Sequence, residues 1–230
     1  RSLRQASDVV PKLAIIQCKD DPVINTYVRL KKQYGADILA EVDIHVVPQN
    51  EIAKLLQKLN KDKTIHGIIV QLPLTDTSET EEIVSKVAPE KDVDGLGKTN
   101  EFEPATPMAI LWLLAGYNVD LRGKHILLVG RGKLVGRPLE RMLKDEGHDV
   151  EIVGRDVDLA SRAIEADVII SATGSAGVLK PDMVKENAVV VDAGTASESG
   201  KVVGDVAPEM YEREDITITP VKGGVGPLTV

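Results

Sequence analysis

The chain has 230 residues, of which 43% are hydrophobic and 28% charged, and its formal net charge is −8. This balance fits one large or two small globular domains, and the acidic excess argues against the basic face that nucleic-acid binding requires. The single cysteine, Cys18, precludes an intrachain disulfide. No apolar run approaches the length of a membrane span, and the N-terminus has no signal-peptide pattern. We therefore expect a cytoplasmic protein that binds neither membrane nor nucleic acid.

Short apolar, β-prone runs alternate with helical patterns from one end of the chain to the other. This alternation predicts parallel sheets with helices on both faces. The strands are expected at residues 13–18, 42–47, 67–72, 125–130, 150–153, 167–171, 188–192 and 216–219. The helices are expected at residues 24–34, 49–59, 78–87, 107–117, 134–145 and 159–166.

The stretch from Pro89 to Pro107 is dense in Gly, Pro and charged residues and has no strong periodicity. It separates three predicted strands from the remaining five. The sequence therefore predicts an α/β protein of two lobes around a cleft, in which the C-terminal lobe is a Rossmann-type parallel sheet.

The fourth predicted strand runs into a glycine loop that contains Gly130, Arg131, Gly132 and Gly136. Glycines at such a strand–helix turn let the backbone approach a dinucleotide pyrophosphate, although the last interval is one residue longer than in the usual fingerprint. The next strand ends in Gly-Arg-Asp at residues 154–156, where Arg155 suits a 2′-phosphate and Asp156 a free ribose. Arg131 favours NADP, NAD stays open, and the alternative is that both arginines are solvated surface charges.

Two later strands end in the same way as the fourth. Gly174 follows one of them, and Gly194-Thr195 follows the next. Ligands of open α/β sheets bind beyond the carboxyl ends of the strands, so these glycines support a dinucleotide lobe. Ordinary turn glycines are the alternative.

The front half carries polar residues in places that need an explanation. Tyr27 and Lys31 lie four residues apart, on one face of a predicted helix. Gln71 ends an apolar strand and needs a partner, either a loop backbone or a ligand. Asp92 and Asp94 either cap a turn or bind a polar ring. No His or Cys cluster has metal-ligand spacing, so no metal is expected.

Seven motifs in this order resemble the bifunctional methylenetetrahydrofolate dehydrogenase/cyclohydrolase (FolD) family. They are Tyr27–Lys31, Val70–Leu74, Lys91–Gly95, Thr106-Pro107, Val129–Pro138, Val203–Val206 and Thr219–Pro227. The chain departs from the family pattern at Ile24, Ala105, Gly132, Gly154-Arg155 and Lys222.

The resemblance implies oxidation of 5,10-methylenetetrahydrofolate with NADP, followed by hydrolysis of the methenyl product to 10-formyltetrahydrofolate, in one-carbon metabolism and purine biosynthesis. By resemblance, Lys31 is the cyclohydrolase catalyst, Gln71 orients it, Tyr27 stacks on the folate and Asp94 binds the pterin. The cofactor would contact Gly130, Arg131, Gly132, Arg155, Gly174 and Thr195. Gly223 and Gly224 would bring backbone close to the substrate. A homodimer is expected from the family.

With this resemblance, residues 1–115 are expected to form the folate-binding catalytic domain and 116–221 the NAD(P)-binding domain. Residues 222–230 would return toward the first domain. Three alternatives stay open: a dehydrogenase without cyclohydrolase activity, a non-catalytic nucleotide sensor, and an enzyme for another pterin carrier.

Overall fold

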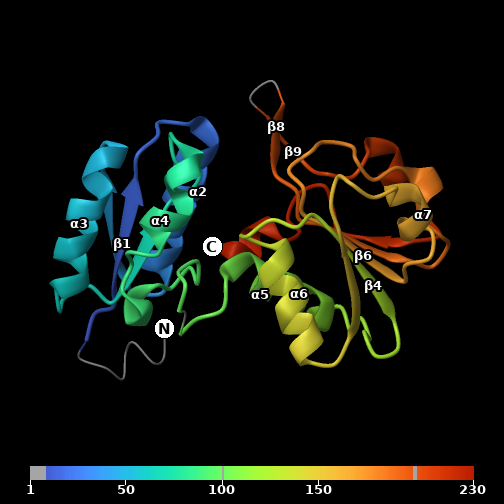
Figure 1. Cartoon of the computed structure of the whole chain (residues 1–230), viewed down its shortest axis with the longest axis horizontal. Helices are drawn as coiled ribbons and strands as arrows, with labels where there is room; N and C mark the ends of the chain where they lie inside the picture. The colour runs from blue at the N-terminus through green and yellow to red at the C-terminus, as the bar shows by residue number, and fades with distance from the viewer. Residues whose placement is uncertain (1–8, 100, 199–200) are drawn as a thin grey trace. The chain divides into compact units, whose positions relative to one another are not determined.

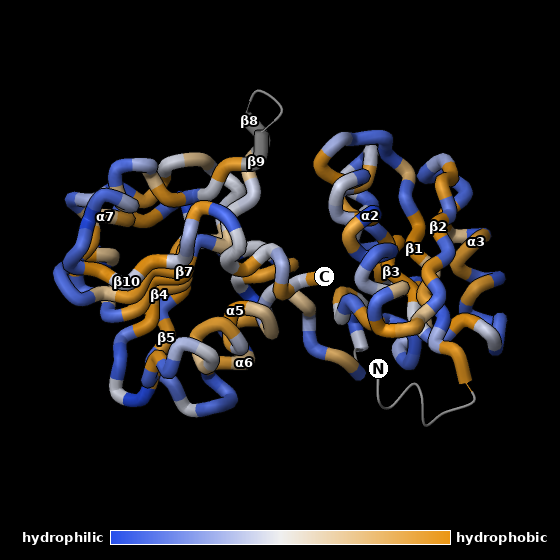
Figure 2. Tube along the Cα trace, turned by 180° about the vertical axis from the view of Figure 1, so that it is seen from behind, coloured by the Kyte–Doolittle hydropathy of each residue, from blue (hydrophilic) through white to orange (hydrophobic). Residues whose placement is uncertain are grey.

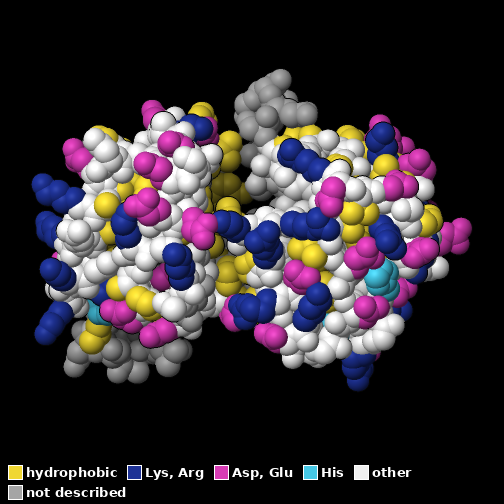
Figure 3. All heavy atoms as spheres, viewed as in Figure 1, with side chains coloured by type: hydrophobic (Ala, Val, Ile, Leu, Met, Phe, Trp, Pro, Cys, Tyr) yellow, Lys and Arg dark blue, Asp and Glu magenta, His cyan; other side chains and the backbone are white. Residues whose placement is uncertain are grey.

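A computed structural model describes residues 9–99, 101–198 and 201–230 (Figure 1). The chain divides into two compact units, the first ending at Glu103 and the second running from Pro104 to Thr229. No helix in the described ranges is both long enough and apolar enough to cross a bilayer. On the face shown in Figure 3, Lys and Arg side chains are interspersed with Asp and Glu.

The first unit is built on a parallel sheet in the order β2-β1-β3. Its strands are β1 (Lys12–Gln17), β2 (Glu41–Val46) and β3 (Gly67–Val70), and its helices are α2 (Pro22–Asp37), α3 (Gln49–Lys61) and α4 (Thr80–Val84). Successive β1 residues face opposite sides, as the two-residue strand period requires. Ala14 and Ile16 pack in one core with α3 and α4, whereas Ile15 packs in another with α2.

The second unit is built on a parallel sheet in the order β10-β7-β6-β4-β5. Its strands are β4 (His125–Val129), β5 (Asp149–Val153), β6 (Val168–Ser171), β7 (Val189–Asp192) and β10 (Thr217–Ile218). One face is covered by α5 (Ala105–Gly116) and α6 (Gly136–Asp145), and the other by α7 (Leu159–Ala163). Hydrophobic residues run along the strands, shown in orange in Figure 2. The predicted two-lobed α/β fold with parallel sheets is confirmed.

Some element bounds differ from those predicted. The helix expected at 78–87 is a 3₁₀ turn, η1 (Thr77–Glu79), followed by the short α4, because Lys86 and Val87 donate to carbonyls three residues back. The helix expected from Leu134 begins at Gly136. A two-stranded antiparallel hairpin, β8 (Ala196–Glu198) and β9 (Lys201–Val203), was not predicted, since its three-residue strands are too short to show a period.

The compact units divide at residue 103, whereas the sequence placed the domain boundary after residue 115. Helix α5 accounts for the difference, because Ala109, Ile110 and Leu114 are buried in the core that contains β4 and α6. The last turn, η5 (Gly226–Thr229), contacts α5 within the second unit. A return of residues 222–230 to the first domain stays a prediction.

Candidate active site and cofactor-binding loops

The first unit gathers three of the predicted polar residues. Lys31 comes from α2, Gln71 directly follows β3, and Asp94 follows the 3₁₀ turn η2 (Pro89–Lys91). The Lys31 ammonium donates a hydrogen bond to Gln71 Oε1 at 3.1 Å. Gln71 Nε2 in turn donates to the Leu72 carbonyl at 3.1 Å, which orients the amide so that its oxygen faces the lysine. The polar residue at the strand end therefore has a backbone partner and a lysine partner.

Lys31 and Asp94 are both half-buried, and each influences the charge of the other. Burial lowers the pKa of Lys31, and the Asp94 carboxylate partly opposes that change. Burial raises the pKa of Asp94, the Lys31 ammonium opposes the rise, and Asp92 adds to it. Desolvation disfavours each charged form, so this pair is suited to exchange protons nearer neutrality than free side chains do.

Tyr27 lies one helical turn before Lys31 and is half-buried. The i, i+4 spacing puts both side chains on the same face of α2. Ile24, where the resembled family usually has Ser, is 3% exposed and packs against Ile15 and Ile69 in the core beneath α2. This departure therefore adds an apolar anchor for the helix that carries Lys31.

The Lys91–Gly95 motif contains two residues that hold the backbone. The Lys91 ammonium donates to the carbonyls of Leu59, Asn60 and Asp62 at 2.9, 2.9 and 2.7 Å, at the C-terminus of α3. This binding satisfies carbonyls that the helix end leaves without partners. Sequence reasoning assigned no role to Lys91, and the signal that could have found it is a lysine next to a turn in an otherwise acidic motif.

Asp92 is 3% exposed and accepts from the backbone N–H of Gly97 at 2.7 Å. Asp92 therefore caps a turn, which was one of the two roles considered for the motif's acids. Asp94 is the remaining acid, and it is the one beside Lys31.

In the second unit, the glycine loop lies at the point where the strand order reverses. Strand β4 pairs with β5 on one side and β6 on the other, and ligands of open α/β sheets bind at such a switch point. Gly130 has φ +117°, and a Cβ there would lie 2.5 Å from the Ala172 carbonyl oxygen. A Cβ on Gly136, the first residue of α6, would lie 1.8 Å from the Gly130 carbonyl oxygen.

The loop is thus closed on itself and on β6 by contacts that only glycine permits. By contrast, a Cβ on Gly132 would meet no atom within 4 Å. No side chain caps α6, and Arg137 N–H bonds to the Gly132 carbonyl at 3.0 Å. The Leu139 N–H bonds to the Val135 carbonyl at 3.0 Å and Pro138 has no N–H, so an anion at this turn would meet the Gly136 N–H and the positive end of the helix dipole.

The other predicted cofactor residues surround the same sheet edge or remain at the surface. Gly174 has φ +67° and follows β6, while Thr195 is exposed beyond β7. Arg155 is exposed beyond β5. Of the two glycines predicted to bind substrate, Gly223 is exposed with φ +85°, and Gly224 is buried in the segment that leads to η5.

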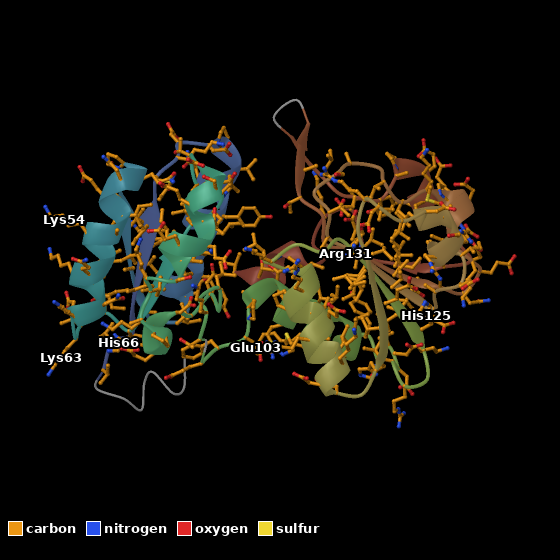
Figure 4. All side chains as sticks on the ribbon, viewed as in Figure 1. Lys54, Lys63, His66, Glu103, His125 and Arg131 are labelled. Carbon is orange, nitrogen blue, oxygen red and sulfur yellow. The ribbon has the colours of Figure 1, made fainter. Side chains whose placement is uncertain are left out.

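Arg131, labelled in Figure 4, contacts the end of β5 from the glycine loop. Its Nη1 donates to both carboxylate oxygens of Asp156, at 3.0 and 3.1 Å, and its Nη2 donates to the Ile152 carbonyl at 3.4 Å. Asp156 is therefore the partner of Arg131, and its pKa is lowered by a backbone hydrogen bond and by the guanidinium. The pair lies beyond the end of β5, where the sequence predicts contacts with the adenosine ribose or its 2′-phosphate.

Two carboxylates at the strand ends, the buried Asp205 and the half-buried Asp192, were not predicted as site residues. Asp205 is fully buried and accepts from Ser171 Oγ at 2.8 Å and from the backbone N–H groups of Thr173 and Ser175. It therefore shapes the loop after β6. An acid between Gly204 and an apolar residue, inside the Val203–Val206 motif, was the available signal.

Asp192, the last residue of β7, accepts from the backbone N–H groups of Gly194, Asp205 and Val206 at 3.0, 3.0 and 3.1 Å. A Cβ on Gly194 would lie 2.1 Å from Asp205 Oδ1, and one on Gly204 would lie 1.9 Å from Asp192 Oδ2. Hydrogen bonds to the two carboxylates thus hold the loops after β6 and β7, and the two glycines leave room for those carboxylates.

A two-unit α/β protein with a lysine–amide–carboxylate cluster in one unit and a dinucleotide-type loop in the other fits a nucleotide-dependent enzyme with a second reactive site. Residues 1–94 match the model of the tetrahydrofolate dehydrogenase/cyclohydrolase catalytic domain, and residues 104–230 match that of its NAD(P)-binding domain. The chain belongs to the tetrahydrofolate dehydrogenase/cyclohydrolase family.

Individual relatives agree with this membership. The Bifunctional protein FolD of Lactobacillus acidophilus is 39% identical over 96% of this chain and 83% of its own length. The crystal structure of FolD from Campylobacter jejuni has a TM-score of 0.90 at 36% identity, covering 99% of this chain and 86% of its own. The crystal structure of the Trypanosoma brucei enzyme, complexed with NADP cofactor and inhibitor, has a TM-score of 0.89 at 30% identity, and the match covers 98% of this chain and 84% of that one.

Proposed function

We propose that this protein oxidises 5,10-methylenetetrahydrofolate to 5,10-methenyltetrahydrofolate with NADP and then hydrolyses the product to 10-formyltetrahydrofolate, with Lys31 as the cyclohydrolase catalyst. Membership of the dehydrogenase/cyclohydrolase family carries the two activities. The hydrogen bond from Lys31 to Gln71, beside Asp94, carries the assignment of the residues.

The residues of the second unit fit a bound dinucleotide. Gly130 and Gly136 let the loop close tightly, and the start of α6 would present the positive end of the helix dipole to the pyrophosphate. Arg131 would reach the adenosine ribose or its 2′-phosphate, and Gly132, Arg155, Gly174 and Thr195 would complete the contacts. When bound, the nicotinamide supplies a hydride acceptor, so orientation rather than a general base governs the oxidation.

The hydrolytic step needs a group that can take a proton from water. Water adds to the cationic methenyl carbon, and the oxygen loses two protons as it becomes the formyl oxygen: N5 gains one of them when the carbon–nitrogen bond to N5 breaks, and the other is released to solvent. A lysine whose pKa is lowered by burial holds more of its neutral, proton-accepting form at a given pH. Gln71 holds the Lys31 amine in one direction, and Lys31 returns the proton as an acid.

The remaining residues would bind the folate. Asp94 would accept hydrogen bonds from the amino-pyrimidine edge of the pterin, and Tyr27 would stack on the folate. Gly223 and Gly224 would bring backbone close to the substrate. We also propose that the protein acts in the cytoplasm as a homodimer. The family resemblance supports the dimer, and the lone Cys18 is consistent with a reducing compartment.

The test is turnover of methylenetetrahydrofolate, measured in separate reactions with NADP and with NAD. Acid quenching separates reduced nicotinamide from the methenyl compound, whose absorbances overlap. Reduced cofactor with little accumulated methenyl intermediate is the expected result. Turnover that stops at the methenyl compound would instead define a dehydrogenase without cyclohydrolase activity. No turnover with either cofactor, on folded protein, would contradict the proposed function.

A further inference from the structure

The carboxylate of Asp156 is bound to the guanidinium of Arg131, the cation proposed above to reach the adenosine ribose or its 2′-phosphate. Both Asp156 oxygens lie within 3.1 Å of Arg131 Nη1. A second hydrogen bond, from Nη2 to the Ile152 carbonyl, holds the guanidinium against the end of β5. The guanidinium thus already has an anionic partner before any nucleotide binds.

Gly154 makes room for this pair. A Cβ on Gly154 would lie 2.8 Å from Asp156 Oδ1 and 3.3 Å from Arg131 Nη1. The residue lies where the chain departs from the resembled family, and its missing side chain is the space that the two charged groups fill. The glycine at residue 154 therefore accommodates the ion pair between Arg131 and Asp156.

We propose that Asp156 determines dinucleotide selectivity: it competes with a 2′-phosphate for Arg131 and so weakens the preference for NADP over NAD. This inference rests on the proposed function of the second unit. A 2′-phosphate must displace Asp156 and stay near its negative charge. A free 2′-hydroxyl leaves the ion pair intact and can donate a hydrogen bond to the carboxylate.

The geometry makes the competition reversible. The Asp156 side chain is 69% exposed and that of Arg131 43%, so water solvates the carboxylate once it is displaced. Exposed pairs of this kind contribute little to stability, so the pair can open without unfolding the loop. Arg155, exposed on the same turn, is a second cation that a 2′-phosphate could reach after the displacement.

The test is the affinity of the protein for two fragments, adenosine 2′,5′-bisphosphate and adenosine 5′-monophosphate, measured by isothermal titration calorimetry. Asp156→Asn should tighten binding of the bisphosphate about tenfold, because it removes both the competitor and a nearby negative charge. The affinity of the Asp156→Asn variant for adenosine 5′-monophosphate should differ from that of the unsubstituted protein by about twofold or less. Asp156→Ser should act in the same direction. Added salt should shrink the gain.

Asp158→Asn is the matched control. Asp158 is also exposed and acidic, but it caps α7 through the backbone N–H of Ala160 and asparagine can replace it in that role. Its substitution should leave the ratio of the two affinities unchanged. The inference is overturned if Asp156→Asn leaves the ratio unchanged, or if Asp158→Asn shifts it equally. If the unsubstituted protein binds neither fragment, the nucleotide site itself is wrong and the inference falls with it.

Discussion

The two units prepare their sites in opposite ways. In the first, the site is formed by half-buried side chains. Burial lowers the pKa of Lys31 and raises that of Asp94, and Gln71 accepts a hydrogen bond from the lysine. In the second, the site is formed by backbone loops. Glycines permit these loops to approach one another closely, and the fully buried Asp205 holds them in place. Substitutions in the first unit should therefore change chemistry, whereas those in the second should change stability and cofactor binding together.

Gly136→Ala should have the largest effect on stability. Its Cβ would meet the Gly130 carbonyl oxygen at 1.8 Å, and the three nearest atoms are all backbone, which leaves little room to adjust. We expect a loss of about 3 kcal/mol or more in the free energy of unfolding, with loss of dinucleotide binding. Urea unfolding followed by circular dichroism measures the first effect and calorimetry the second. Unchanged stability would show that the loop is not closed by this contact.

Asp205→Asn should come next. The carboxylate accepts three hydrogen bonds while fully buried, and an amide must turn its N–H₂ toward at least one donor. We expect a loss of about 3 kcal/mol in the free energy of unfolding. Asp182→Asn, at an exposed residue in the 3₁₀ turn η3 (Pro181–Met183), is a control in the same unit. Equal, small effects of both substitutions in urea would contradict the role assigned to Asp205.

Lys91→Met tests whether the first unit also contains a purely structural charge. It removes a cation bound to three carbonyls at the end of α3, and we expect a loss of about 2 kcal/mol in the free energy of unfolding. The cyclohydrolase kcat of the folded variant should be unchanged, since the Lys91 ammonium binds the carbonyls at the end of α3 and not the Lys31 cluster. A large fall in kcat without loss of stability would place Lys91 in the chemistry instead.

Asp94→Asn should shift the pH dependence of hydrolysis. Asp94 raises the pKa of Lys31 against the lowering by burial, so removing its charge should lower that pKa further. The neutral lysine then forms at lower pH, and the rising limb of cyclohydrolase kcat should move to lower pH. The profile is recorded at saturating methenyltetrahydrofolate and corrected for uncatalysed hydrolysis. A shift to higher pH would contradict the coupling.

Gly132→Ser should have the smallest effect. A Cβ there meets no atom within 4 Å, and the resembled family usually carries Ser at this position. We expect a change in the free energy of unfolding of about 0.5 kcal/mol or less. The contrast with Gly136→Ala, in the same loop, separates glycines that close the loop from one that does not. A loss comparable to that of Gly136→Ala would remove the distinction.

The sequence predicted much of this arrangement because parallel strands and their covering helices follow from apolar periodicity. The spacing of its glycines also indicated the glycine loop, and the family resemblance implied the pairing of Lys31 with Gln71. The sequence did not indicate to which unit α5 belongs, because that helix is apolar all round and its pattern does not show which sheet it covers.

The roles of Asp92 and Asp205, and the ion pair of Arg131 with Asp156, depend on contacts between residues 5 to 34 positions apart. Local pattern carries little information about such contacts. A buried acid and an exposed acid look alike in a sequence, and only the fold shows which backbone N–H groups surround each one.

The most direct test of the account is Lys31→Met, compared with Lys32→Met at the exposed neighbouring lysine. Both variants should oxidise methylenetetrahydrofolate, because the hydride transfer needs no base. The Lys31 variant alone should release the methenyl compound unhydrolysed, with cyclohydrolase kcat lowered about 1,000-fold or more. Full cyclohydrolase activity in Lys31→Met, with folding intact, would contradict the assignment of Lys31 as the catalyst.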